Sequence, residues 1–205
     1  MAISTEAIVV SPTIVAATRL EARAVRRAWP GARIVHAGVG LTHARGDELG
    51  DVVVSCGLAG GLDIALHTGA VLVPHVVLRP DGEMLECDRA LVGVLEQAAR
   101  HLGYEPEAAP LVTCGTLIVG DARHAWRQRG YTGVDMEIGL IRAPRVAAVR
   151  VVLDTPGHEL DAAWLHPISV VLHPTAWRQL PWVHREAPRC ARIAAEIVAA
   201  ALATA

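Results

Sequence analysis

The sequence predicts a single α/β domain over residues 1–205. The chain is long enough for one sizeable domain and too short for two ordinary ones. Hydrophobic residues make up 52% of the chain and charged residues 20%, so a large aliphatic core is possible. Short runs of β-branched residues alternate with helical patterns, which is typical of layered α/β domains. Glycines and acids stand at the carboxyl ends of the strand-like runs, where open α/β sheets bind ligands.

The first half of the chain is expected to alternate strands and helices. Pro30-Gly31 ends the first helix, and Pro80-Asp81-Gly82 forms a turn after the last strand of this half. The predicted strands are 14–17, 33–36, 51–56 and 70–78, and the predicted helices are 20–28 and 42–49.

The second half carries clear helix signals. Asp88 is the predicted cap of a helix that ends near Gly103, and Asp121 is the predicted cap of a short helix. The run 146–153 is predicted to be a strand buried on both faces, because Arg150 alone interrupts its apolar residues. A further strand is predicted at 111–119, and an Ala-rich pattern predicts a terminal helix over 187–203.

Composition and charge exclude several classes of protein. The net charge of −2 shows no basic excess, which argues against nucleic acid as a partner. Four scattered cysteines form no CxxC pair, so a reducing cytoplasm is the expected compartment. No signal peptide is expected, and the apolar stretch interrupted by Glu196 is too short to span a bilayer. The ten histidines show no metal-ligand spacing, so no metal is expected.

Two glycine clusters follow predicted strands. Gly57-Leu58-Ala59-Gly60-Gly61 comes after a buried strand, and Gly38-Val39-Gly40 comes after another. Glycines allow positive φ and let a substrate approach the backbone, although each cluster alone is most simply a tight turn. Because both clusters stand at carboxyl ends of strands, Gly40, Gly57 and Gly60 are candidate substrate-binding residues.

Two acidic motifs complete the pattern. Val-Asp-Met-Glu occupies 134–137, and Val149-Arg150 leads through an apolar run to Asp154. Each of two apolar runs thus leads to an acidic residue, and two carboxylates so placed are expected at the end of the sheet where ligands bind.

These motifs occur in the order found in the purine and uridine phosphorylase superfamily, which the chain resembles from about Ile14 to Asp154. Within it the chain looks most like the methylthioadenosine/S-adenosylhomocysteine nucleosidases and the hopanoid-associated nucleoside phosphorylases. Leu165-His166-Pro167 and the final helix are more similar to the hopanoid-associated branch. The resemblance implies a three-layer α/β/α sandwich with a central mixed sheet, nucleoside phosphorylase-like.

Asp154 matches the family's aspartate that donates a proton to the purine N7 as the glycosidic bond breaks. Such a general acid typically contributes about 10²–10⁴ in rate. Burial at the end of an apolar strand would raise its pKa and keep the proton available. Without the other motifs, a helix cap or a turn residue would be the simpler explanation, because Asp154-Thr-Pro-Gly157 is also a good turn.

Glu137 matches the glutamate that bonds the ribose 2′- and 3′-hydroxyls, and Met136 would form an apolar wall against the sugar. The simpler alternatives are an exposed Glu at a helix start and a Met in the core. Arg150 lies on the strand face of Asp154 and either pairs with an active-site carboxylate or satisfies a buried acid.

Glu21 aligns with the nucleosidase glutamate that positions the attacking water. A solvated helix face is an equal alternative, because arginines surround it. Arg19 and Arg23 would alternatively bind phosphate, which would then be the nucleophile and a co-substrate. Against this, Leu58 stands where many relatives carry a hydroxyl residue.

The chain departs from the pattern of the nucleosidases at two further places, one near the expected base site and one near the expected ribose site. Arg123 falls where the nucleosidases often have an aromatic residue stacking on the purine, so it is either a stacking residue or plain surface. The stretch from Glu137 to Arg150 is shorter than expected and contains Pro144.

The combined expectation is an enzyme that cleaves the N-glycosidic bond of a purine nucleoside, with adenine as the base, by water or phosphate. A large 5′ substituent such as adenosylhopane is the expectation if the branch likeness holds. The alternative is a nucleoside-binding module that has lost catalysis. By family likeness the chain is expected to form a homo-oligomer, and the chemistry needs no cofactor.

Overall fold

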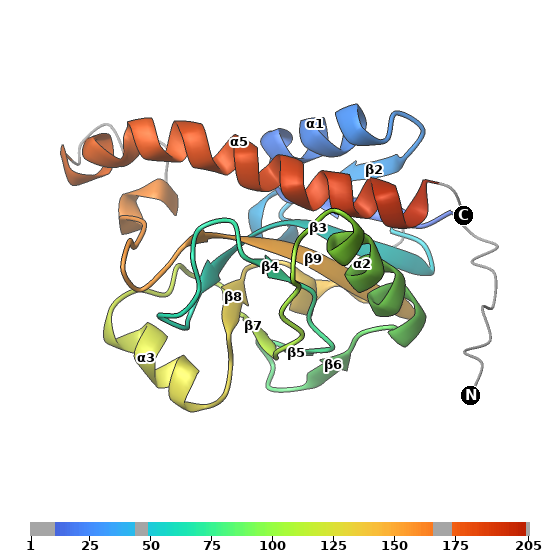
Figure 1. Ribbon diagram of the computed structural model, residues 1–205. Coiled ribbons are helices and arrows are strands. Elements are labelled where there is room, and N and C mark those ends of the chain that lie inside the picture. Colours follow the sequence, from blue (N-terminus) through green and yellow to red (C-terminus); the bar gives the residue numbers. More distant parts are fainter. Residues whose placement is uncertain (1–10, 44–48, 166–173, 204–205) are drawn as a thin grey trace.

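The computed structural model of the protein describes residues 11–43, 49–165 and 174–203. In this part of the chain nine strands form one mixed sheet with helices around it, which confirms the predicted α/β fold (Figure 1). The strands are β1 (Thr13–Ala16), β2 (Arg33–His36), β3 (Val52–Gly61), β4 (Val71–Leu72), β5 (Val76–Leu78), β6 (Met84–Glu86), β7 (Leu111–Thr113), β8 (Gly133–Asp135) and β9 (Arg145–Asp154). The helices are α1 (Arg19–Ala28), α2 (Arg89–His101), α3 (Asp121–Gln128) and α5 (Pro174–Leu202), with 3₁₀ turns η1 (Val39–Leu41), η3 (Ile138–Leu140) and η4 (Ala162–Leu165).

The long strand β3 organises the sheet. It pairs in parallel with β1 and with β9, and its last residues pair antiparallel with β8. From β8 the sheet continues through β7 and β5 to β6. The carboxyl ends of β1, β3 and β9 therefore meet near the end of β8, at one edge of the sheet.

A bulge interrupts the pairing of β3 with β9. Val152 lies opposite Ala59, but the register then shifts, so that Asp154 rather than Leu153 lies opposite Gly60. Side chains alternate between the two faces of a strand, so a shift of one residue changes which face a side chain occupies. The bulge therefore decides where the carboxylate of Asp154 lies.

Helix α5 covers the sheet and carries much of the core. It packs against α1, α2, β3 and β9, and Figure 1 shows α1 and α5 together on one side, with α3 on the other. Ile193, Ile197 and Val198 are buried and belong to the same core cluster as Val53 and Val149. The aliphatic face of α5 thus buries apolar surface against the sheet, which a core with few aromatic residues needs for its stability. Among the described helices, none is long and apolar enough to cross a membrane.

Several local predictions agree with the structure. Helix α1 and strand β2 lie where they were expected, and the Asp88 carboxylate caps α2 by accepting a hydrogen bond of 3.0 Å from the Leu91 N–H. Gly103 follows α2 with a φ of 84°, the left-handed conformation that commonly ends helices.

The glycine cluster is not the tight turn that was the simpler alternative, and the predicted strand 51–56 extends through it. Residues 57–61 continue β3, because β9 pairs with them along one edge and β8 pairs with Gly60 and Gly61. The predicted strand 70–78 is wrong as one unit, since Pro74 separates β4 from β5. Proline offers no N–H to a sheet, and the two halves pair with different strands.

Three boundaries in the second half also differ. The predicted strand 111–119 ends at Thr113, and Gly120 rather than Asp121 is the N-cap of α3. Asp121 lies in the first turn instead, where a negative charge still favours the helix dipole. The terminal helix begins at Pro174 rather than at 187 and contains Pro181 and Pro188, both exposed. Most of the predicted helix 42–49, with His166 and Pro167, lies outside the described residues.

The position of α5 in the core predicts that shortening one of its buried side chains lowers the stability of the protein. Ile197→Ala removes a side chain that is fully buried between α5 and the sheet. The free energy of unfolding should fall by about 2–5 kcal/mol because a cavity remains. Urea unfolding followed by circular dichroism measures the change, with Ile64→Ala as the control because Ile64 is 84% exposed. Equal losses in both variants would contradict the assignment of α5 to the core.

Candidate active site

A pocket of about 220 Å³ opens where the carboxyl ends of β1, β3, β8 and β9 meet. Six of the nine predicted site residues line it: Glu21, Gly60, Arg123, Met136, Glu137 and Asp154. The other three, Gly40, Gly57 and Arg150, lie behind it and contact its acidic side chains. The lining of the pocket therefore combines acidic side chains with mostly aliphatic ones.

Glu21 is buried rather than on a solvated helix face. It lies in the first turn of α1, where its Oε2 accepts hydrogen bonds from the Thr18 N–H (2.7 Å) and hydroxyl (2.8 Å). Thr18 in turn caps the helix by accepting from the Glu21 N–H, which completes a capping box. The Glu21 Oε1 accepts from the Leu58 N–H at 3.0 Å. The local sequence that starts α1 thus also fixes a carboxylate at the pocket.

Gly57 is required by its contact with Glu21. A Cβ at this position would lie 2.5 Å from Glu21 Oε1 and 3.6 Å from Arg150 Nη1. Any side chain would therefore push the Glu21 carboxylate away from β3. Gly57 acts in the structure by leaving room for an acid, and it does not line the pocket.

Glu137 faces the pocket just after β8. Its Oε1 accepts a hydrogen bond of 3.3 Å from the Gly40 N–H, and its Oε2 lies 3.8 Å from Arg150 Nη2. Gly40 has a φ of 64°, the left-handed conformation that glycine adopts readily. Burial, then the nearby charge of Asp135, raises the pKa of Glu137 to about 7.

Arg150 satisfies a buried acid, one of the two roles considered for it. Its Nε and Nη2 donate to the Oδ2 of Asp135 at 3.0 and 2.6 Å, and Nη2 also donates to the Ser55 hydroxyl. Asp135 further accepts from the Thr113 hydroxyl (2.6 Å) and the Ile138 N–H (2.9 Å). This network holds the turn that carries Glu137. Sequence reasoning passed over Asp135 although it stands inside the Val-Asp-Met-Glu motif.

Asp154 is the last residue of β9 and is 2% exposed. Its Oδ2 forms an ion pair with Arg123 Nη2 and accepts from the Leu160 N–H at 3.3 Å. Burial raises the pKa of Asp154, and the adjacent Arg123 guanidinium opposes that rise. A Cβ on Gly60 would lie 3.2 Å from Asp154 Oδ1, so glycine gives this carboxylate its space.

Arg123 is neither plain surface nor free to stack on a base. It is 1% exposed, and its guanidinium donates to the carbonyl oxygens of Ile118 (2.8 Å) and Gly61 (2.6 Å) as well as to Asp154. Trp164 is the aromatic residue that lines the described pocket, and its indole N–H donates to Gln179 of α5 at 3.1 Å. No sequence signal indicated Trp164, because it lies beyond the motifs.

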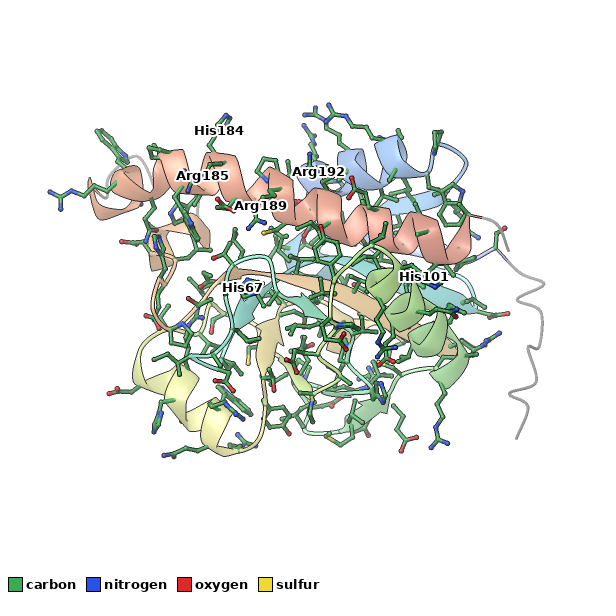
Figure 2. All side chains as sticks on the ribbon, in the orientation of Figure 1. His67, His101, His184, Arg185, Arg189 and Arg192 are labelled. Carbon is green, nitrogen blue, oxygen red and sulfur yellow. The ribbon has the colours of Figure 1, made fainter. Side chains whose placement is uncertain are left out.

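The cations predicted to bind phosphate lie elsewhere. Arg19 and Arg23 are exposed on α1 and do not line the pocket. The arginines labelled along α5 in Figure 2 are also outside it, and Arg189 pairs with Glu186 at 2.7 Å. Among the described lining residues Arg123 is the one cation, and Asp154 holds it.

The fold and the pocket can be compared with known proteins. The sequence matches no family model and no curated protein. Solved structures match over nearly the whole chain. This is the nucleosidase fold. The methylthioadenosine/S-adenosylhomocysteine nucleosidase of Neisseria meningitidis, in complex with methylthio-immucillin-A, has a TM-score of 0.70 at 16% identity, over 94% of this chain and 98% of that one.

Two further structures show the same nucleosidase fold. The S-adenosylhomocysteine nucleosidase of Streptococcus pyogenes has a TM-score of 0.69 at 14% identity, over 97% of this chain and 99% of that one. A futalosine hydrolase mutant of Helicobacter pylori has a TM-score of 0.67 at 12% identity, over 94% and 98% of the two chains. The similarity covers both chains almost completely, so the predicted likeness holds for the whole fold.

The raised pKa of Glu137 predicts a pH-dependent stability. Glu137 keeps its proton in the folded protein up to about pH 7, while the unfolded chain loses it near the ordinary value of 4.5. Ionising Glu137 in the folded protein therefore lowers the free energy of unfolding. This destabilisation is absent below pH 4.5, grows as the pH rises and reaches its full size above pH 7. Glu137→Gln should raise the free energy of unfolding at pH 8 by about 2–3 kcal/mol and change it little at pH 4.

Urea unfolding of both proteins at the two pH values measures this difference. Glu105→Gln is the control because Glu105 is 85% exposed. A Glu137→Gln effect that is the same at pH 4 and pH 8 would show that the carboxyl ionises normally.

Proposed function

We propose that this protein hydrolyses the N-glycosidic bond of a purine nucleoside. The observation that carries the proposal is the meeting of three buried carboxylates, Glu21, Glu137 and Asp154, around one pocket. They come from three separate elements, α1, the end of β8 and the end of β9. A nucleoside in such a pocket would have an acid at its sugar, an acid at its base and an acid beside the anomeric carbon.

Each carboxylate has one role in the proposed reaction. Glu137 accepts hydrogen bonds from the ribose 2′- and 3′-hydroxyls, and Met136 packs against the sugar. The C1′–N bond breaks with its electron pair leaving on the base, and Asp154 gives the base a proton. Water adds to C1′ of the oxocarbenium-like sugar while Glu21 takes its proton. The products are the free base and the 5′-substituted ribose, and the two carboxyl groups then exchange the proton with solvent.

The charges of the pocket favour water over phosphate as the nucleophile. Phosphate would enter beside Glu21, Asp135 and Glu137, and the cation in the described pocket is already paired with Asp154. Placing an anion among carboxylates without a free cation is costly. Water has no such cost, and Glu21 can accept its proton through an oxygen at the pocket.

The base and the 5′ group are proposed from likeness. Adenine is the proposed base because similar structures are named as methylthioadenosine and S-adenosylhomocysteine nucleosidases. A futalosine hydrolase is equally similar in fold, so futalosine belongs among the test substrates. Adenosylhopane stays a candidate from the sequence resemblance. A homo-oligomeric state and a cytoplasmic location also stay predictions.

Base release measures the proposed activity. Free base is quantified by chromatography after incubation with methylthioadenosine, S-adenosylhomocysteine, adenosine, futalosine and an adenosyl-lipid analogue, each with and without phosphate. Release that does not depend on phosphate is expected. Release that requires phosphate would replace hydrolysis by phosphorolysis.

Asp154→Asn should reduce kcat/KM for base release by about 10²–10⁴, because an amide cannot deliver the proton. Circular dichroism and urea unfolding show whether the variant still folds, since Arg123 loses its partner. Asp63→Asn, which removes a half-exposed surface ion pair with Arg127, is the matched control and should keep full activity. Equal turnover by Asp154→Asn and the native protein would refute the role of Asp154.

A binding module without catalysis is the second candidate function. The ion pair of Arg123 with Asp154 favours it, because a guanidinium stabilises the ionised carboxylate that cannot donate a proton. Isothermal titration with adenine and methylthioadenosine tests this alternative. Binding with no base release from any substrate of the panel would support it over hydrolysis.

A further inference from the structure

We propose that Arg123 and Glu159 are positioning residues for Asp154, with Arg123 holding one carboxylate oxygen of Asp154 and Glu159 holding Arg123. The proposal rests on the proposed function in so far as Asp154 is the proton donor. Glu159 lies outside the motifs and does not line the pocket. It acts through Arg123 and does not touch the substrate.

The guanidinium of Arg123 connects the two acids. Its Nη2 pairs with the Oδ2 of Asp154, while its Nε lies 3.2 Å from Oε1 of Glu159. The same Nε donates a hydrogen bond to the Ile118 carbonyl oxygen at 2.8 Å, and Nη1 donates to that of Gly61 at 2.6 Å. Because Nη2 pairs with Asp154 and Nε pairs with Glu159, the guanidinium is held between the two acids and cannot rotate further into the pocket.

Glu159 is itself held in place. Both of its carboxylate oxygens accept from the Gly120 N–H, at 2.9 and 3.0 Å, at the start of α3. Its carbonyl oxygen accepts from the Gln179 side chain of α5 at 2.7 Å, and Gln179 also accepts from the Asp161 N–H. The segment that follows β9 is thus fastened to two helices. The fold therefore fixes the distance from Glu159 to Arg123.

This arrangement decides which oxygen of Asp154 can carry a proton. Oδ2 receives the Arg123 guanidinium and the Leu160 N–H, and both of these donors oppose protonation of that oxygen. Oδ1 lies on the other side of the carboxyl group from this ion pair, beside Gly60, which lines the pocket. A proton on Asp154 is therefore expected on Oδ1, the oxygen from which it can pass to the base.

The charges also set how readily that proton is held. Burial raises the pKa of Asp154 and Arg123 lowers it. Glu159 is an anion on the far side of Arg123, so it weakens the field of the guanidinium at Asp154. His158 precedes Glu159, and its ring stacks on Trp182. The other charged groups around the pocket are Glu21, Asp135, Glu137 and Arg150, and none of the variants below changes them.

The proposal predicts titration shifts of opposite sign. Glu159→Gln keeps an oxygen for Gly120 and Arg123 but removes the anion, so the pKa of Asp154 should fall by about 0.5–1 unit. Arg123→Gln removes the cation, so the pKa should rise by about 1–3 units. Arg123→Lys keeps the charge and should restore most of the native value. Asp63→Asn should leave it unchanged.

Carbon-13 NMR of aspartate-labelled protein measures the titration directly, and the Asp154 signal is assigned by its loss in Asp154→Asn. The pH profile of kcat/KM gives a second readout, in which activity is lost as the pH rises through the pKa of Asp154. That limb should move to lower pH in Glu159→Gln and to higher pH in Arg123→Gln. A loss of packing alone would reduce kcat/KM without moving the limb in opposite directions.

The two measurements separate the possible failures. Shifts of the same sign, or no shift in Glu159→Gln with the protein folded, would overturn the positioning role whatever the activity. If Arg123→Gln does not fold, Arg123→Lys and Glu159→Gln still decide the question. If the NMR shifts occur as expected but no substrate releases a base, the positioning of Asp154 stands and the proposed hydrolysis fails.

Discussion

The structure depends on keeping four carboxylates buried around one small pocket. An isolated buried charge costs several kcal/mol, and removing the partner of a buried ion pair typically costs about 3–5 kcal/mol. Two buried arginines meet part of this requirement, Arg150 at Asp135 and Arg123 at Asp154. Glu21 relies on the N–H groups at the start of α1 and on β3 instead. Glu137 is buried beside Asp135 with little compensation, and its pKa is raised to about 7.

Much of the site was predictable because the residues that form it lie at the ends of recognisable elements. An apolar run that ends in an acid predicts a buried carboxylate, and Asp154 and Glu137 both follow such runs. The capping pattern Thr18 to Glu21 was also available in the sequence and places the Glu21 carboxylate at the start of α1, while its contact with β3 accompanies its burial. Local patterns thus located the acids along the chain, although partners on other elements hold each carboxylate in place.

The parts that escaped prediction depend on contacts between distant segments. Glycines 57–61 have the composition of a turn, yet β8 and β9 pair with them and make them a strand. The burial of Arg123 follows from Asp154 and Glu159, which lie more than thirty residues away in sequence. Trp164 lies at the pocket with its indole N–H bonded to Gln179 of α5. Periodicity and turn signals carry no information about such long-range partners.

The three nucleosidases that share this fold are 12–16% identical to the chain in sequence, so few side chains are in common. The common feature is the path of the backbone, and in this chain the bulge opposite Ala59 and Gly60 is the part of that path that places Asp154. It brings Asp154 to the place opposite Gly60 that Leu153 would otherwise occupy. Inserting or deleting one residue between Arg150 and Asp154 would turn the carboxylate to the other face of the sheet. Apolar residues of β9 can therefore be exchanged for others that fill the same core volume, whereas a change in the number of residues before Asp154 would move the carboxylate out of the site.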